Sequence, residues 1–177
     1  MMVKIETLAG MEEFKGMDAA ALSVKLEAVE SLIRSYTNNS FQDRSMRIEA
    51  PSMEGELLGS SPYFEPGDTV QVSRSGINDG LYVVKEIAGS VTRLSGRHKL
   101  YDCPVNTVTK VVYPADVQKG VIDMMVWEKN NRQKVGIKSE TLSRHEVTYF
   151  DQDSENQVMG YPVSLLGFLK PYVKPRF

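Results

Sequence analysis

Apolar residues recur at helical spacing in two long stretches of the chain. In the first, they follow steps of four, three, four and three residues: Leu22, Leu26, Val29, Ile33 and Tyr36. This stripe predicts an amphipathic helix that packs against other helices, with Asp18 as its N-cap and Thr37-Asn38-Asn39 at its end. The second helix is expected to start at Pro114, because proline loses no hydrogen bond in the first turn. This helix is expected to end near Asn130-Asn131. Its apolar stripe consists of Val117, Val121, Met124 and Met125.

Two shorter helices are expected near the ends of the chain. Residues 7–15 place Leu8, Met11 and Phe14 on one side before Gly16, which is a natural stop. Near the C-terminus, Tyr161-Pro162 is expected to start a final helix that Pro171 stops.

The period changes from helical to two in the middle of the chain. Alternating β-branched and aromatic residues predict strands at 69–73, 81–87, 91–94 and 105–112, and one more at 146–150. Asn78-Asp79-Gly80 supplies the residues of a tight turn. The middle of the chain is therefore expected to form a small antiparallel unit of four or five short strands, similar to an SH3-like barrel.

These patterns predict an α+β fold. It consists of a small α-helical bundle with an inserted small antiparallel β unit between the second and third helices. The expected divisions are N-terminal helices at 1–40, a linker at 41–62, the β unit at 63–112, and C-terminal helices, a strand-containing loop and a tail at 113–177. The linker is expected because Pro and Gly are frequent there and regular patterns are few.

Composition narrows the class of protein. Apolar residues make up 41% and charged residues 25%, as in an ordinary globular protein. A formal charge of −2 argues against a dominant phosphate-binding role, which needs clustered cations. Cys103 is the single cysteine, so no intrachain disulfide is possible. Neither a signal-peptide core nor about 18 consecutive apolar residues occur, so a soluble cytoplasmic protein without a membrane partner is expected.

Residue types that carry chemistry do not form a recognisable set. His98 and His145, with a single cysteine, lack the spacing of a zinc site. Asp151, Asp153 and Glu155 begin like a calcium loop, but the required glycine and closing acid are missing. We therefore expect that the protein is not an enzyme and that it has no catalytic residue, no metal site and no cofactor.

Two features suggest binding. Trp127 closes the third helix and is either part of the bundle core or an interface anchor. The tail is either a frayed terminus or a docking segment, and the second reading is favoured because prolines keep it extended while aromatic residues alternate with cations. The residues of this predicted docking tail are Lys170, Tyr172, Val173, Lys174, Arg176 and Phe177.

The order of several C-terminal motifs resembles a known family. A Pro-started helix ends in Trp127-Glu128 and is followed by the short motifs Gly136-Ile137-Lys138-Ser139-Glu140, Val147-Thr148-Tyr149, Tyr161-Pro162 and Leu169-Lys170-Pro171-Tyr172. This order is similar to the head-tail connector proteins, also called head-completion or adaptor proteins, of long-tailed double-stranded DNA bacteriophages. The similarity covers the C-terminal third and, more loosely, the N-terminal helices.

The resemblance implies a structural role in the virion neck, with assembly in the host cytoplasm. Copies would form a ring of about twelve-fold symmetry beneath the portal protein by head-to-tail contacts. The tail would dock on the portal, and double-stranded DNA would pass through the channel without sequence-specific contacts. A loop would contact neighbouring copies or a downstream joining or stopper protein through Ile137, Lys138, Ser139, Glu140, Tyr149 and Phe150.

Two other functions stay open at this point. The chain is alternatively a nucleic-acid-binding module that uses the β unit, or another phage neck protein such as a stopper or tail-completion protein. In the first case the expected phosphate contacts are Arg74, Lys85, Arg93, Arg97 and Lys99.

Overall fold

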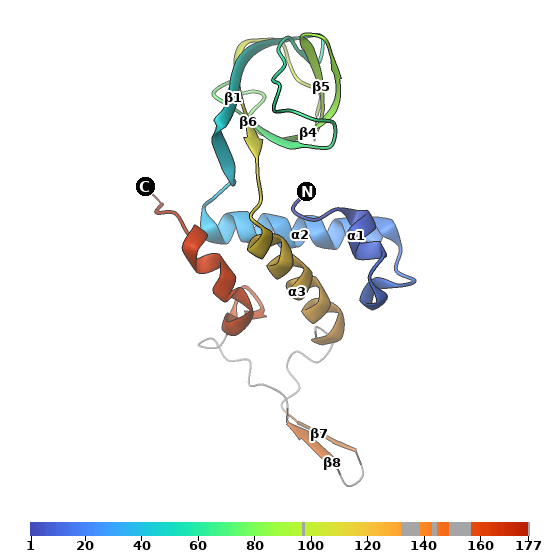
Figure 1. Cartoon of the computed structure of the whole chain (residues 1–177). Coiled ribbons are helices and arrows are strands. Elements are labelled where there is room, and N and C mark those ends of the chain that lie inside the picture. Colours follow the sequence, from blue (N-terminus) through green and yellow to red (C-terminus); the bar gives the residue numbers. More distant parts are fainter. Residues whose placement is uncertain (97, 132–138, 143–144, 149–156, 177) are drawn as a thin grey trace. The chain divides into compact units, whose positions relative to one another are not determined.

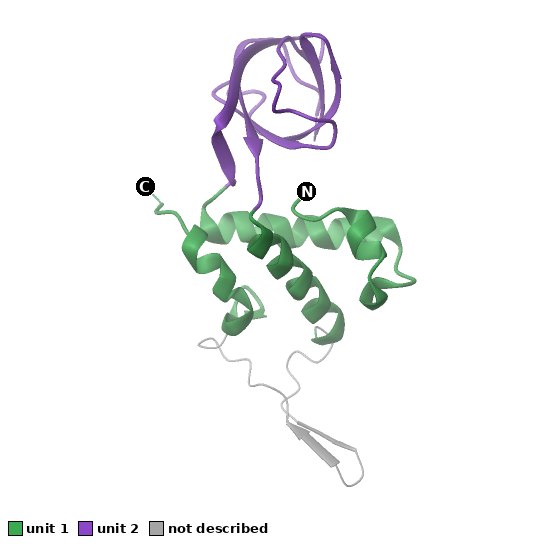
Figure 2. Cartoon of the chain, viewed as in Figure 1, with its two compact units in different colours: residues 1–39, 114–177 green, residues 40–113 purple. Residues whose placement is uncertain are grey.

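The chain is an α+β protein with two compact units (Figure 2). The computed structural model describes residues 1–96, 98–131, 139–142, 145–148 and 157–176, and of the strands at 139–142 and 145–148 it describes the backbone. One unit combines Met1–Asn39 with Pro114–Phe177, and the other is Ser40–Tyr113. All strand pairings among the described residues are antiparallel.

The first unit is mainly helical (Figure 1). Its helices are α1 (Ile5–Ala9), the 3-10 helix η1 (Glu12–Phe14), α2 (Ala19–Thr37), α3 (Ala115–Asn131) and the 3-10 helix η3 (Val163–Tyr172). Helix α2 packs against α1, α3 and η3, and α3 also packs against η3. No helix in the described part of the chain has the length and apolar character that crossing a bilayer requires.

Helix α2 forms as its periodicity predicts. The Asp18 carboxylate accepts a hydrogen bond from the Ala21 N–H at 3.0 Å, which satisfies one of the free donors of the first turn. Asn38 ends the helix in the left-handed conformation, with φ of 47°. Every residue of the expected stripe except Tyr36 is buried: Leu22, Leu26, Val29 and Ile33.

Helix α3 also matches the expected bounds, since it starts directly after Pro114 and ends at Asn131. Val117, Val121, Met124 and Met125 are buried as predicted. Gly120 lies on the same buried face, where the Phe168 ring of η3 packs so closely that no Cβ would fit.

The C-terminal segment differs from the expected helix. Tyr161–Pro162 is strand β10, which pairs with β9 (Gln157–Val158) instead of starting a helix. The following η3 is a 3-10 helix that includes Pro171. Proline is tolerated there because in the last turn it removes only one main-chain donor. The strand expected at 146–150 corresponds to β8 (His145–Thr148), which pairs with β7 (Ser139–Leu142), and residues 149–150 lie outside the described part.

The second unit is a closed antiparallel barrel, a larger sheet than the small unit expected. Its strands are β1 (Gln42–Met53), β2 (Glu56–Leu57), β3 (Thr69–Ser73), β4 (Gly80–Ala88), β5 (Val91–Ser95) and β6 (Cys103–Val111). They follow the spatial order β1-β2-β5-β4-β3-β6, and β6 pairs with β1 to close the barrel.

The expected linker at 41–62 was wrong, because it contains β1 and β2. The inward positions of the longest strand include Ala50 and Ser52, which are buried but give no apolar signal. Pro51 also suggested irregular structure. It lies at the register shift between β1 and β6, where a proline interrupts no ladder hydrogen bond.

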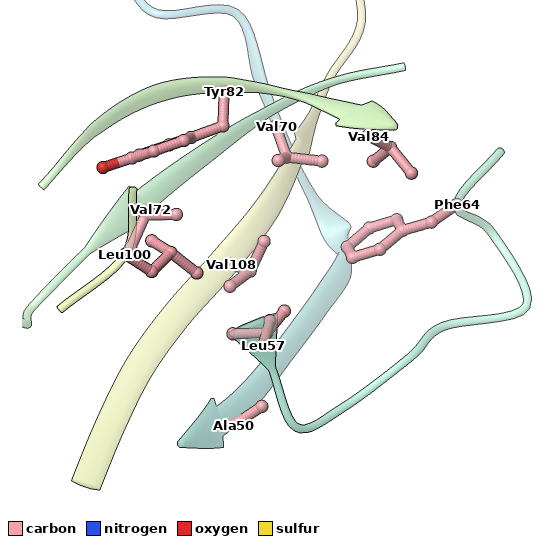
Figure 3. Close-up of a cluster of buried hydrophobic side chains, with 9 residues drawn as sticks. All are labelled: Ala50, Leu57, Phe64, Val70, Val72, Tyr82, Val84, Leu100 and Val108. Carbon is pink, nitrogen blue, oxygen red and sulfur yellow. The ribbon is translucent and has the colours of Figure 1, made fainter. Parts of the chain in front are cut away.

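The interior of the barrel is apolar (Figure 3). Its buried side chains come from five of the strands and two connecting segments: Ala50, Leu57, Phe64, Val70, Val72, Tyr82, Val84, Leu100 and Val108. Where the chain enters and leaves this unit, the Phe41 and Tyr113 rings lie 5.4 Å apart. The Val112 N–H donates to the Phe41 carbonyl at 2.9 Å, so the two ends of the barrel segment are held together.

Candidate functional site

The predicted docking tail lies against the C-terminal end of α2. The Lys174 N–H donates to the Thr37 carbonyl at 2.8 Å, and the Arg176 guanidinium donates to the Ser35 carbonyl at 2.5 Å. The last four carbonyls of an α-helix have no partner within the helix. The tail therefore supplies donors to two of these carbonyls in α2, and its cation suits the negative end of the helix dipole.

Two asparagines at the end of α2 bind the tail in return. The Asn39 side-chain amide donates to the Tyr172 carbonyl at 3.1 Å, and the Asn38 amide donates to the Pro175 carbonyl at 2.8 Å. Asn38 thus both terminates the helix by its backbone and holds the tail by its side chain. The tail and the helix end exchange hydrogen bonds in both directions.

A third anchor joins the tail to the start of α3. The Tyr172 hydroxyl donates to Asp116, with both carboxylate oxygens 2.8 Å away. This hydrogen bond, with smaller contributions from desolvation and from the negative charge of Asp116, raises the pKa of Tyr172 above its usual value. The hydrogen bond to Asp116 stabilises the neutral Tyr172 phenol relative to the phenolate.

Exposure changes sharply along this segment. Leu169 is completely buried, whereas Val173 is 48% exposed. Lys170, Lys174 and Arg176 are exposed, and Phe177 lies outside the described residues. The segment of residues 170–176, called the tail from here on, is held by hydrogen bonds to the ends of α2 and α3 and buries little apolar surface.

The predicted contact loop is described only in part. Ser139 and Glu140 lie in β7, where they pair with Thr148 and Val147 of β8. Ile137, Lys138, Tyr149 and Phe150 lie outside the described residues.

Trp127 lies at an open apolar pocket of the helical unit. The pocket has a volume of about 340 Å³ and is lined by Trp127, Pro162, Ser164 and Leu165. The indole ring is half-buried and packs at 5.3 Å from the ring of Tyr161, whose hydroxyl donates to Glu128. Trp127 therefore packs partly within the helical unit and also lines this pocket, and its role as an interface anchor stays a prediction.

The cations considered for nucleic-acid binding are partly engaged by acids of the barrel. Arg93 forms ion pairs of 2.6 Å with both Glu56 and Glu86, and these carboxylates raise its pKa. Arg74 lies 4.0 Å from Glu49. Such pairing reduces the positive potential available to a phosphate backbone.

The structure describes two of the other three expected phosphate contacts. Lys85 and Lys99 are exposed, and Arg97 lies outside the described residues.

The His98 ring lies near two tyrosines and not near a set of metal ligands. Its centroid is 6.0 Å from that of Tyr82 and 5.6 Å from that of Tyr101. Within the part of the chain that the structure describes, no three His, Cys, Asp or Glu residues are grouped as metal ligands. His145 lies in β8, of which only the backbone is described.

Three residues of this site were not identified from the sequence: Asn38, Asn39 and Asp116. Sequence reasoning assigned the asparagines only to helix termination and gave Asp116 no role. The available signal was that adjacent asparagines at a helix end carry amide donors that the helix itself does not use.

The chain matches no protein-family model and no curated protein.

Proposed function

We propose that this chain is a structural head-tail connector of a long-tailed double-stranded DNA bacteriophage and that its tail binds the portal protein. The observation that carries the proposal is the tail, which begins in the last turn of η3 and continues beyond it, and which presents exposed cations and an exposed apolar side chain, Val173. Few of its apolar atoms are buried within the chain, so they are available to a partner.

The chemistry of the tail indicates the kind of surface it would bind. Lys174 contacts α2 through its main-chain N–H, so its exposed ammonium group is not needed for that contact. With Val173 beside it, this group suits a groove that is acidic and partly apolar, as in the core and rim of a protein interface. We propose that the portal supplies this groove.

The order of elements in the helical unit adds support. The described residues of the motifs that resemble the connector family lie on α3, β7, β8, β10 and η3, in that order. Copies would form a ring of about twelve-fold symmetry by head-to-tail contacts, with the segments around β7 and β8 meeting a neighbour or a downstream stopper protein. DNA would pass through the ring without sequence-specific contacts, in the neck of the virion, and the role would involve no catalysis.

The pairing of Arg93 and Arg74 with acids favours the connector over a nucleic-acid-binding module. A phosphate backbone would have to displace these carboxylates before it gained the cations.

Sedimentation with purified portal rings tests the proposal. The full-length protein should co-sediment with portal rings at moderate salt. Lys174→Glu should weaken the association at least about tenfold, because it reverses an exposed charge within the proposed interface. Lys85→Glu is the matched control, since it reverses an exposed charge on the barrel.

A full-length protein that does not sediment with portal rings would contradict the proposal. Salt-sensitive binding to DNA in the same conditions would then favour the nucleic-acid-binding module, and binding to another neck protein would favour a stopper or tail-completion role.

A further inference from the structure

The tail and the helix ends that hold it form a separable contact. Leu166 and Leu169 anchor η3 in the core, with 3% and 0% of their surface exposed. Beyond them the tail is held by hydrogen bonds to Ser35, Thr37 and Asp116, most of them solvent-exposed. Segments with few buried apolar contacts open locally at a much lower free energy than the whole unit unfolds. Opening of the tail is therefore expected without loss of the fold.

We propose that the tail is a latch that the free chain keeps closed on its own α2 and α3, and that must open before it docks on a partner. The closed latch uses the Tyr172 hydroxyl, the Lys174 N–H and the Arg176 guanidinium. A partner that binds the Tyr172 hydroxyl, the Lys174 main chain or the Arg176 guanidinium must compete for these groups, whereas the Lys174 ammonium group is exposed even in the closed tail. The docking half of this inference rests on the proposed function, whereas the closed latch is a property of the isolated chain.

The latch provides a simple control over assembly. A binding-competent state that is only fractionally populated lowers the apparent affinity by that fraction. Free copies with closed tails would bind a partner weakly. A partner surface that stabilises the open tail would restore the affinity that the closed state lowers. A weaker latch should therefore speed docking.

Hydrogen exchange of the isolated full-length protein tests the closed latch. The Lys174 amide should be protected, because it donates to Thr37. Tyr172→Phe removes the hydroxyl that contacts Asp116 and should make this amide exchange about tenfold faster, the effect of one hydrogen bond to a charged group. Amides in the middle of α2, such as that of Leu26, should keep their rates. Tyr101→Phe, at a tyrosine 53% exposed on the barrel, is the matched control.

Two results would overturn the latch. One is a Lys174 amide that exchanges in the wild-type protein as fast as in an unfolded chain. The other is a Lys174 amide that exchanges only together with the Leu26 amide, because the tail would then open only when the whole unit unfolds.

A second variant tests whether the latch controls docking. Asn38→Gly deletes the amide that donates to the Pro175 carbonyl, while glycine accepts the left-handed backbone at this position without strain. The tail itself is unchanged. Association with portal rings should become several-fold faster than for the wild-type protein. An unchanged or slower rate would overturn the control of docking. No binding by the wild-type protein would instead overturn the proposed function, and the exchange rates would still decide whether the latch is closed.

Discussion

At the scale of single residues, Asn78 connects three segments of the barrel. The NH2 of its buried side chain donates to the Tyr101 carbonyl and to the Asn106 side-chain oxygen, both at 2.9 Å, and the same nitrogen lies 3.2 Å from the Ser52 hydroxyl. The side-chain oxygen of Asn78 accepts a hydrogen bond from the Tyr101 main-chain N–H at 2.8 Å. A buried network of this kind is stable only while each of its members has a partner.

Replacing Asn78 should therefore destabilise the barrel strongly. Asn78→Ala leaves several buried polar groups without partners, and we expect a loss of about 2–3 kcal/mol in the free energy of unfolding. Urea unfolding followed by circular dichroism measures this loss. Asn131→Ala, which removes an amide at the half-buried end of α3, should change stability by about 0.5 kcal/mol or less. A similar loss in the free energy of unfolding in both variants would show that the Asn78 network stabilises the barrel no more than an ordinary surface hydrogen bond does.

Gly120 is required by a close contact and not by its backbone conformation. A Cβ at this position would overlap the Phe168 ring. Alanine favours a helix over glycine by about 1 kcal/mol, but forcing the ring to move costs about 1–3 kcal/mol. We expect Gly120→Ala to lower the free energy of unfolding, and Gly167→Ala, where a Cβ meets no atom, to leave it nearly unchanged. A stabilised Gly120→Ala protein in urea unfolding would contradict this account of the α3–η3 contact.

At the scale of elements, the start of α3 meets the tail through a group that titrates, the Tyr172 hydroxyl. The pKa of Tyr172 is raised above 10.0 by Asp116, so the neutral phenol is the form that the closed tail favours. A raised folded pKa means that this contribution is complete below the unfolded pKa and is lost as pH rises through the folded one. The tail should therefore loosen at alkaline pH.

Methyl NMR of Val173 measures this loosening. Its resonances should move as the pH rises above about 10 in the wild-type protein, because the pKa of Tyr172 is raised above the usual tyrosine value and ionised Tyr172 faces the Asp116 carboxylate. Tyr172→Phe should already show the loosened tail at neutral pH and should lack that part of the titration. Equal titrations in both proteins would mean that ionisation of Tyr172 does not loosen the tail.

At the scale of the whole molecule, the barrel segment has the features of an independently folding unit. It has its own apolar core, and its two ends are joined by the Phe41–Tyr113 contact and by the hydrogen bond between Val112 and Phe41. A segment whose ends already lie together can be inserted into or removed from a host chain without strain.

Residues 40–113 expressed alone should therefore fold. We expect a β-sheet circular dichroism spectrum and a cooperative thermal transition, because a closed sheet leaves no unpaired edge. The same segment with Asn78→Ala should unfold at a lower temperature. A spectrum of an unfolded chain for the unmodified segment would show that the barrel depends on the helical unit.

The sequence by itself determined the elements whose signals are local. Helices α2 and α3 follow from apolar spacing and from Asp18, Pro114 and Asn38, because a helix is specified within its own turns. Strands β3, β4, β5 and β6 follow from alternation, since successive side chains of a strand point to opposite faces.

Only the tertiary structure decided the features that depend on distant partners. Strand β1 has small or polar residues such as Ala50 and Ser52 at inward positions, and it is a strand because β6, far along the chain, pairs with it. The tail takes its course because Ser35, Thr37 and Asp116 lie within reach of its hydrogen-bonding groups. Neither pairing leaves a periodic signal, because a hydrogen bond between remote residues depends on where the fold places them and not on the residues beside them in the sequence.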